Sequence, residues 1–277
     1  MNISKNIESK TIIPPLIQKS EKADGLENSI NNESAENVVE IRNLFVSFGK
    51  KNKVLKGLNL HLEKGESLVV LGKSGSGKSV AIKSLVGLVR PDKGVLDVFG
   101  KDVCKLDLDG LNKIRLRIGF LFQNGALYDS MTVRENLAFT FLRHTKRNYS
   151  KEIDEKILAT LESVGLEKAI DKFPSELSGG MKKRAGLARI LILKPELMLY
   201  DEPTTGLDPI TSREISELIK SIQAKYNTSS IIITHDLACA KSTANRVVIL
   251  KDGIIGAEGT YEELEQCEDE WVRSFFE

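Results

Sequence analysis

The segment GKSGSGKS at residues 72–79 constrains this sequence more than any other, because it follows the apolar run SLVVL without a break. Glycine and serine side chains fill little space in a core, so this loop is predicted to hold a ligand. Its glycines, lysine and last serine match the pattern G-x-x-x-x-G-K-[ST], which cradles phosphate. A turn that matches by chance is the alternative, and the preceding strand and following helix make it the weaker interpretation.

Each residue type in this loop has a physical role in holding phosphate. Without Cβ atoms, the glycines let backbone N–H groups converge on the anion, and the following helix points its positive end at the same place. The ammonium of Lys78 can reach the β- and γ-phosphates, and the hydroxyl of Ser79 is a ligand for Mg²⁺. The nucleotide is therefore predicted to contact Gly72, Lys73, Ser74, Gly75, Ser76, Gly77, Lys78, Ser79 and Val80.

A pair of acids ends a second apolar run, LMLYDEP, much later in the chain. In a P-loop NTPase a carboxylate at this point holds the magnesium ion, so Asp201 is predicted to hold Mg²⁺ through water. Glu202 is then placed to polarise the attacking water. Two solvated acids at a strand end are the alternative, but a P-loop without an acid for Mg²⁺ would be incomplete.

The segment LSGGMKKR at residues 177–184 predicts a second anion site. Ser178, Gly179 and Gly180 open a helix, and a helix N-terminus attracts negative charge. Because one P-loop already surrounds one nucleotide, we expect this second site to face the nucleotide of another copy of the chain. The basic run at residues 182–184, which includes Lys183, is predicted to be the exposed face of that helix and not a nucleic-acid patch.

From about residue 38 to 277 the sequence resembles the ABC-transporter ATPase family, whose signature LSGGQ stands here as LSGGM, with Met181 at the last position. The resemblance implies that Gln123 is the Q-loop glutamine, in contact with Mg²⁺ and water. It also implies that Asp208, in TTGLDP, belongs to the D-loop. His235, in IIITHD, is by the same resemblance the switch histidine beside the γ-phosphate.

Phe48, in VSFGKKNKVL, stands where that family has the aromatic side chain that stacks on adenine. A place in the ordinary core is the alternative for Phe48. The resemblance further implies ATP and Mg²⁺ as cofactors and two copies that face head to tail. In that arrangement Ser178, Gly179 and Gly180 of one copy complete the γ-phosphate site of the other.

The resemblance implies an α/β fold, namely a P-loop NTPase (RecA-like) core with an antiparallel β subdomain and a helical insertion subdomain. The hydrophobic pattern agrees, because segments with the helical period fall between about residues 124 and 195. Residues 1–37, rich in Ser, Asn, Lys and Glu, are predicted to form a flexible tail. Residues 38–277 are predicted to form the ATPase domain, which ends in a C-terminal segment at about 262–277.

Three local features carry their own expectations. The segment SVAIKSLVGLV predicts a helix that stops at Arg90-Pro91, and RIGFLFQ predicts a strand that ends at Gln123. At the C-terminus, spacing on a helix places four large apolar side chains on one face. That face is predicted to pack either on the core of its own subunit or on the opposite subunit, and the sequence leaves both open. Its members are Trp271, Val272, Phe275 and Phe276.

Within the family, GALYDSMTVRENLAF, LSGGM and the closing WVRSFFE resemble the ATPases of MCE-type lipid transport systems, the MlaF and Mkl-like group. This resemblance implies a homodimer with an integral membrane permease, an MCE-type lipid-binding protein and a phospholipid or related lipid as cargo. It implies a peripheral position at the cytoplasmic face of the inner (plasma) membrane. It also places Ala126, Leu127 and Tyr128 in the groove that receives the coupling helix of the permease.

Composition narrows the function classes. A net charge of +1 gives no bulk attraction to nucleic acid or to an anionic membrane, and no apolar run approaches the roughly 18 residues of a membrane span. Cys104, Cys239 and Cys267 have no metal-ligand spacing and are predicted to be reduced thiols.

Two other functions remain possible. An ABC importer for amino acids or other small solutes shares every ATP motif. A soluble ATPase that acts on DNA or ribosomes is disfavoured, because the chain has one ATPase unit, no zinc spacing and no heptad arm. No nucleic-acid partner is therefore expected.

Overall fold

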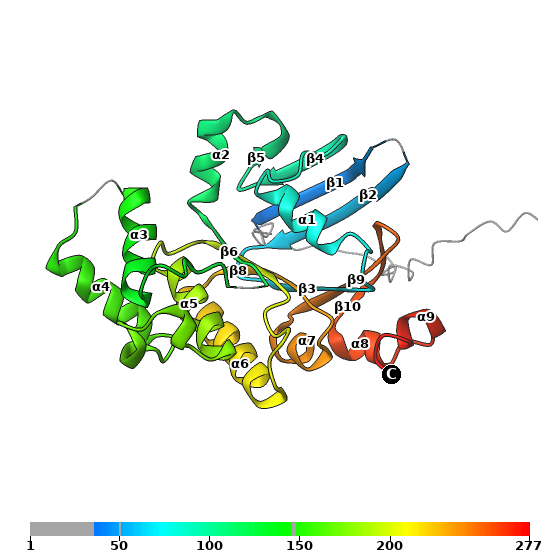
Figure 1. Ribbon diagram of the computed structural model, residues 1–277. Helices are drawn as coiled ribbons and strands as arrows, with labels where there is room; N and C mark the ends of the chain where they lie inside the picture. Colours follow the sequence, from blue (N-terminus) through cyan, green and yellow to red (C-terminus); the bar gives the residue numbers. More distant parts are fainter. Residues whose placement is uncertain (1–35, 50, 124, 146–147) are drawn as a thin grey trace, which may run out of the picture. The chain divides into compact units, whose positions relative to one another are not determined.

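Two β-sheets organise the residues that the computed structural model describes, which are residues 36–277 without 50, 124, 146 and 147 (Figure 1). The predicted N-terminal tail lies outside the described residues, except for residues 36 and 37. The first sheet is antiparallel, with its strands in the order β2-β1-β4-β5. Its members are β1 (Asn37–Phe48), β2 (Asn52–Glu63), β4 (Lys93–Val98) and β5 (Lys101–Asp102).

The second sheet has the strand order β10-β9-β3-β8-β7-β6, and only the edge strand β10 runs antiparallel to its neighbour. Helices or the first sheet cover its faces, which explains why β3, β7, β8 and β9 are buried along most of their length, whereas the edge strand β10 is partly exposed. The two sheets confirm the predicted α/β fold with an antiparallel β layer. The strands are β3 (Ser67–Gly72), β6 (Ile118–Leu121), β7 (Leu197–Asp201), β8 (Ser229–Ile233), β9 (Arg246–Lys251) and β10 (Ile254–Gly259).

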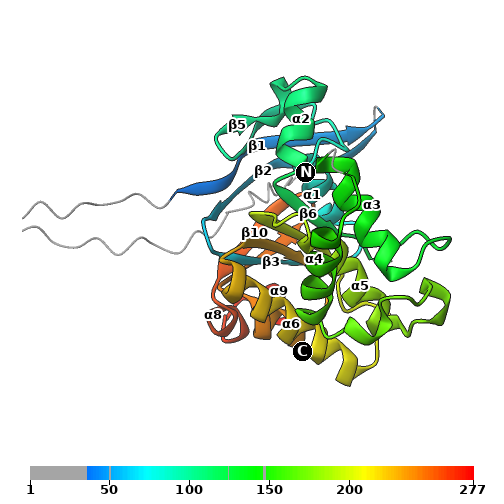
Figure 2. The ribbon, with the colours of Figure 1, turned by 90° about the vertical axis from the view of Figure 1, so that its left-hand side faces the viewer.

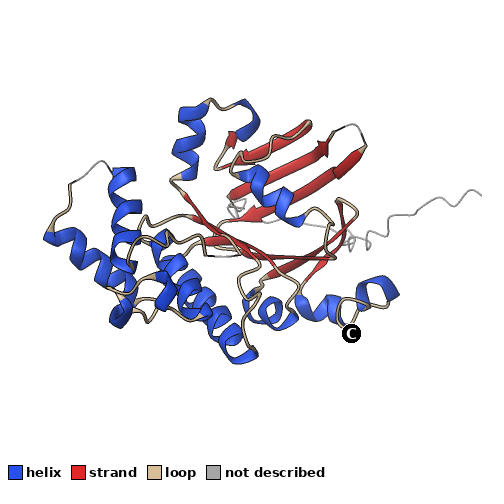
Figure 3. Ribbon diagram, in the orientation of Figure 1, coloured by secondary structure: helices blue, strands red, loops and turns tan. Residues whose placement is uncertain are grey.

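Alternation along β3 assigns its side chains to two separate cores. Leu68 and Val70 pack with helix α1 (Lys78–Leu85) and the antiparallel sheet, whereas Val69 and Leu71 pack with the helices on the other face. Figure 3 shows α1 between the two sheets. The opposite face carries α6 (Pro209–Tyr226) and α7 (Leu237–Thr243), whose buried apolar side chains belong to the same core as Val69 and Leu71.

A group of helices lies between β6 and β7 in the chain, within the predicted insertion. Figures 1 and 2 show α3, α4 and α5 together, beside the β6 edge of the sheet. Apolar positions at helical spacing, such as Ile153, Ile157 and Leu161, are buried between them. The helices of this group are α3 (Val133–Thr145), α4 (Lys151–Glu162) and α5 (Gly179–Leu191). Helix α2 (Leu108–Arg115) precedes β6. Short 3₁₀ turns occupy Val103–Lys105, Glu167–Ala169 and Pro174–Glu176.

Two predicted element ends are wrong. Helix α1 ends at Leu85 and not at Arg90-Pro91, because Gly87 adopts a left-handed conformation (φ +65°) and starts a turn. In this turn the N–H of Leu88 donates to the carbonyl of Lys83 at 2.9 Å. Strand β6 likewise ends at Leu121, and Gln123 lies in the turn that follows.

The C-terminal residues contact the core of their own chain, and the rings of Trp271, Phe275 and Phe276 stay partly exposed, so packing on the opposite subunit remains a prediction. They follow α8 (Tyr261–Glu265) and include α9 (Glu270–Arg273). The Trp271 ring lies against Gly256, where an added Cβ would stand 2.7 Å from the ring. Its centroid is 5.2 Å from that of Phe275, and the Phe276 ring meets Tyr261 edge-on at the same distance. Val272 is buried in the core.

Two further observations concern the described residues. Cys104, Cys239 and Cys267 are free thiols. Of the helices in the described part of the chain, none combines the length and the apolar composition that crossing a bilayer requires.

Trp271→Ala tests the tail packing. Because the substitution removes ring contacts with Gly256 and Phe275, it should lower the free energy of unfolding by about 2 kcal/mol. Urea denaturation measures this loss, which should not depend on protein concentration. Arg273→Ala is the control, since its side chain is half exposed and should cost less than about 0.5 kcal/mol. A destabilisation that appears only on dilution would contradict packing within the subunit.

Candidate nucleotide-binding and active site

An open groove of about 950 Å³ lies at the carboxyl ends of β3 and β7 and brings most of the predicted site residues together. Asn52, Val54 and Thr205 also line the groove, although no role was predicted for them. The predicted residues that line it are Phe48, Gly72, Lys73, Ser74, Gly75, Gly77, Lys78, Ser79, Val80, Gln123, Glu202 and His235. Phe48 is 51% exposed, so its alternative place in the core is wrong.

The P-loop is shaped by its glycines and closed by its lysine. Gly77 precedes α1 with φ +106°, and a Cβ at this position would stand 2.8 Å from the side chain of Leu55. The ammonium of Lys78 donates to the carbonyl of Gly72 at 2.6 Å and to that of Lys73 at 3.2 Å. Ser76 does not line the groove, because its hydroxyl is buried and finds no partner among the described residues.

Charged side chains of both signs lie close together beside the P-loop. Burial lowers the pKa of Lys78, and the nearby carboxylates of Glu202 and Asp201 act in the opposite direction. The buried cation therefore lies within the field of both acids. A ligand with negative phosphates would meet a cation that is already held in place.

Ser79 and Asp201 form the candidate magnesium site. The Ser79 hydroxyl donates to Asp201 Oδ1 at 3.0 Å, so the two oxygens that the sequence assigned to Mg²⁺ are already neighbours. Gln123 lines the same groove. Among the described residues, no cluster of three or more His, Cys, Asp or Glu side chains is arranged to hold a metal ion. The donor set is hydroxyl, carboxylate and amide oxygen, which suits a hard cation that also takes phosphate oxygens and water.

Glu202 is held by its backbone and by two side chains. Its backbone is left-handed (φ +53°), a conformation that costs free energy in a non-glycine residue. Its N–H donates to the carbonyl of Ile233 at 2.9 Å, which continues the pairing of β7 with β8. His235 Nδ1 lies 2.8 Å from Glu202 Oε2, and the Thr205 hydroxyl donates to the same oxygen at 3.1 Å. The carboxylate therefore has a fixed orientation beside the P-loop.

The predicted signature and D-loop residues do not line the groove of their own chain. Ser178 caps α5 by accepting from the N–H of Met181 at 3.3 Å, and both Ser178 and Gly179 are exposed. Gly180 is buried, and an added Cβ would stand 2.5 Å from Thr211 on α6. Asp208 caps α6 and accepts from Thr211 Oγ1 at 2.6 Å. One chain thus separates its two anion-binding elements.

The prediction of an exposed basic run is wrong at Lys183. Its side chain is 6% exposed, because it shares the inner stripe of α5 with Gly180 and Leu187. Lys183 Nζ donates to the carbonyl oxygens of Gln123 and Glu202. Lys183 contacts the site loops from α5, on the side away from the groove. The neighbouring Lys182 and Arg184 made it look like part of an exposed basic face.

The segment after Gln123 exposes apolar surface. Ala126 is exposed with a left-handed backbone (φ +51°), and Leu127 packs partly against the core. Tyr128 is 43% exposed, lies edge-on to Phe139 and has the guanidinium of Arg189 5.6 Å from its ring centroid. An exposed tyrosine ring with an apolar neighbour is suited to a protein contact.

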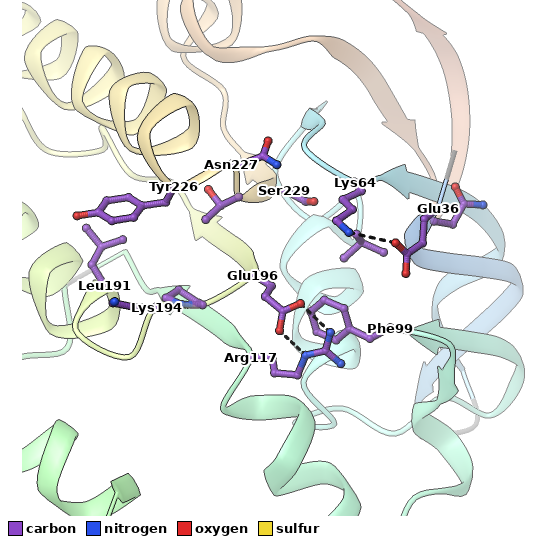
Figure 4. A pocket seen from close by; sticks show the side chains of 14 residues that line it. Glu36, Lys64, Phe99, Arg117, Leu191, Lys194, Glu196, Tyr226, Asn227 and Ser229 are labelled. Atoms are coloured by element: carbon purple, nitrogen blue, oxygen red, sulfur yellow. Dashed lines mark hydrogen bonds and ion pairs between the residues drawn. The ribbon is translucent and has the colours of Figure 1, made fainter. Parts of the chain in front are cut away.

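A second cavity, of about 290 Å³, lies at the amino-terminal ends of β6, β7 and β8, at the opposite edge of the sheet (Figure 4). Arg117 makes a two-pronged ion pair with Glu196 at 2.6 and 2.7 Å and stacks on the Phe99 ring (Figure 4). None of the predicted phosphate-binding residues lines this cavity. The phosphate chemistry therefore belongs to the groove at the carboxyl ends.

Comparison with known proteins supplies independent findings. The profile of the family described as ABC transporter matches residues 55–205. The chain is 39% identical over 243 residues to the intermembrane phospholipid transport system ATP-binding protein MlaF of Haemophilus influenzae, covering 87% of this chain and 90% of that protein. It is 40% identical over 237 residues to the probable ribonucleotide transport ATP-binding protein mkl of Mycobacterium leprae, covering 86% of this chain and 68% of that protein.

Solved structures include a similar fold. The ATP-binding cassette MJ0796, in a dimeric post-hydrolysis state bound to ADP and Pi, matches with a TM-score of 0.73 and 30% identity. The match covers 80% of this chain and 98% of that one.

Thr205→Val tests whether the hydroxyl orients Glu202. The substitution keeps the shape and removes one hydrogen bond to a carboxylate, so kcat for ATP should fall about 10-fold. The KM for ATP should stay within about twofold, since Thr205 supports the acid and not a phosphate contact. Thr205→Ser keeps the hydroxyl and serves as control. Glu202→Gln sets the scale, with an expected loss of about 100-fold or more. Equal rates for the Val and Ser variants would exclude the orienting role.

Proposed function

This chain belongs to the ABC transporter family and is an ATPase, and from that premise we propose that two copies hydrolyse ATP at shared sites to power phospholipid transport through a membrane permease. The observation that carries the proposal is one groove lined by the P-loop lysine, by Ser79 and by the Glu202–His235 pair, with the buried Asp201 hydrogen-bonded to Ser79.

ATP binding begins at the P-loop. Lys78 exchanges its bonds to the loop carbonyls for the β- and γ-phosphates, and the backbone N–H groups of residues 72–79 surround the β-phosphate. Phe48, exposed on the groove, stacks on the adenine ring. Ser79, Asp201 and Gln123 would hold Mg²⁺, which would neutralise negative charge on the phosphates.

The second copy completes the site. Ser178 and Gly179 are exposed at the start of α5 and face away from their own groove, so the dimer that we propose brings them to the γ-phosphate of the partner. Asp208 lies near the same interface. ATP then bridges two surfaces and favours closure of the dimer.

Hydrolysis uses the acid that the structure orients. The carboxylate of Glu202 accepts a proton from the attacking water, and His235 holds that carboxylate while facing the γ-phosphate. Loss of the γ-phosphate removes the contacts that join the two copies, so the dimer opens. The segment around Tyr128, next to the helices α3 to α5, passes this motion to the permease.

The cargo is proposed from the relatives. The MlaF protein is named for phospholipid transport and is matched over 90% of its own length, whereas the mkl protein, named for ribonucleotides, is matched over 68%. The more complete match favours a phospholipid. We therefore also propose an MCE-type lipid-binding protein as a partner. The chain would occupy a peripheral position at the cytoplasmic face of the inner membrane.

Purification from detergent-solubilised membranes tests this function. We expect the tagged chain to retain a permease, an MCE-type protein and phospholipid. A permease with a small-solute or nucleotide binding protein would instead indicate an importer. Bound nucleic acid without a permease would indicate a soluble ATPase.

Tyr128→Asp sharpens the same experiment. A charge at this position, where Tyr128 is 43% exposed, should prevent capture of the permease, because burial of an unpaired charge costs several kcal/mol, against about 2–7 for polar groups alone. ATP binding should persist within about twofold, since Tyr128 does not line the groove. Ile254→Asp is the matched control, as its side chain is 42% exposed on β10. Undiminished permease capture by the Tyr128 variant would remove this segment from the interface.

A further inference from the structure

Lys183 is a buried cation that the ATPase mechanism above does not use. Its side chain is 6% exposed, and no carboxylate among the described residues forms an ion pair with it. A cation at this depth is costly unless polar groups replace its water shell. At this site the replacement comes from two backbone carbonyl oxygens, those of Gln123 and Glu202, the latter at 3.3 Å.

These two carbonyls belong to two different loops that line the groove. The side chains of both residues line that groove, Gln123 after β6 and Glu202 after β7. Lys183 thus joins, through one ammonium, loops that are 79 residues apart in the chain (202 minus 123). Because these hydrogen bonds are made to backbone atoms, they restrain the backbone positions of Gln123 and Glu202. They do not contact the side-chain amide or the carboxylate.

The restraint matters most at Glu202. Its left-handed backbone (φ +53°) is unfavourable for a residue with a Cβ and persists only where surrounding contacts hold it. The N–H of Glu202 is held by Ile233, and its carbonyl is held by Lys183. The Glu202 carbonyl also accepts from the N–H of Thr205 at 3.3 Å, so without Lys183 it keeps only this turn hydrogen bond and the carboxylate is held less firmly.

The position of Lys183 on α5 adds a second consequence. Ser178, at the start of the same helix, is five residues earlier, which corresponds to about 7.5 Å along the helix axis. A rigid helix therefore carries Ser178 at its end and Lys183 in its second turn. Any displacement of Ser178 is passed to the carbonyls that Lys183 holds.

We propose that Lys183 is a positioning residue that fixes the Gln123 and Glu202 loops to the signature helix, so that occupancy of the partner's ATP site at Ser178 is transmitted to the hydrolytic acid of its own site. This inference rests on the shared-site dimer proposed above. Lys183 touches neither ATP nor water, and it acts on the reaction through Glu202.

Lys183→Met is the variant that separates positioning from packing. Methionine has a similar length and fills the buried space but donates no hydrogen bond. We expect kcat for ATP to fall about 10- to 100-fold, because a shift of about 1 Å at a reacting group costs about 100-fold. The KM for ATP should stay within about twofold, and the Hill coefficient for ATP should approach 1. Lys183→Gln, which keeps a neutral donor, should recover part of the lost kcat.

Hydrogen exchange and a control variant test the role of Lys183 without relying on kcat. Amide hydrogen exchange of the nucleotide-free protein should be faster in peptides that contain Gln123 and Glu202, and unchanged in peptides from β1 and β2. Lys182→Met is the matched control, since its side chain is partly exposed on the same helix and forms no hydrogen bond or ion pair with the described residues of the site loops. It should resemble the wild type in every measurement.

The results that contradict the proposal differ from those that contradict the proposed function. A Lys183→Met variant with kcat within twofold of the wild type and unchanged exchange would overturn the positioning role. So would a loss of kcat that is matched by weaker ATP binding and faster exchange throughout the protein, and so would a glutamine variant no better than the methionine one. A wild-type protein without ATPase activity would refute the proposed function, while local exchange in the variant would still report on the Lys183 contacts.

Discussion

The parallel register of β3, β8 and β7 is the constraint on which the site depends. Val70 of β3 pairs with Ile233 of β8, and Ile233 also pairs with Asp201 of β7. The P-loop, His235 and Glu202 each follow one of these paired residues within a few positions. Three segments distant in the chain therefore meet at one edge because carboxyl ends of parallel strands share that edge. A slip of one residue would turn Asp201 to the opposite face and separate the groups.

Electrostatics add a second layer to this geometry. Two buried lysines, Lys78 and Lys183, approach the two acids Asp201 and Glu202 from the groove side and from the helix side. Burial lowers the pKa of each lysine below its usual value. The two acids oppose this shift but do not cancel it. The site thus holds charges of both signs close together before any nucleotide arrives. A phosphate that enters can form its contacts with groups that are already desolvated, which is the condition for strong electrostatic stabilisation.

The sequence predicted the parts of the site whose chemistry is local. Lys78 and Ser79, singled out by the P-loop pattern, line the groove together with Glu202 from LMLYDEP, because each motif is a short strand followed by polar residues. Features set by tertiary contacts were not predictable. Lys183 appeared exposed because the basic run concealed the inner face of α5. Helix α1 ended early because Gly87 took a left-handed conformation, which no periodicity reveals.

The central claim is that each ATP site is built from two copies of the chain. Mixing Lys78→Ala protein with Ser178→Arg protein tests it most directly. The first change removes the proposed phosphate contact of the P-loop, and the second places a bulky cation where the partner's γ-phosphate would lie in the proposed dimer. Each variant alone should be inactive. Heterodimers contain one site with both defects and one with neither, so the mixture should regain part of the wild-type ATPase rate. A mixture as inactive as its components, or wild-type protein fully active at dilutions where no dimer forms, would contradict the shared site.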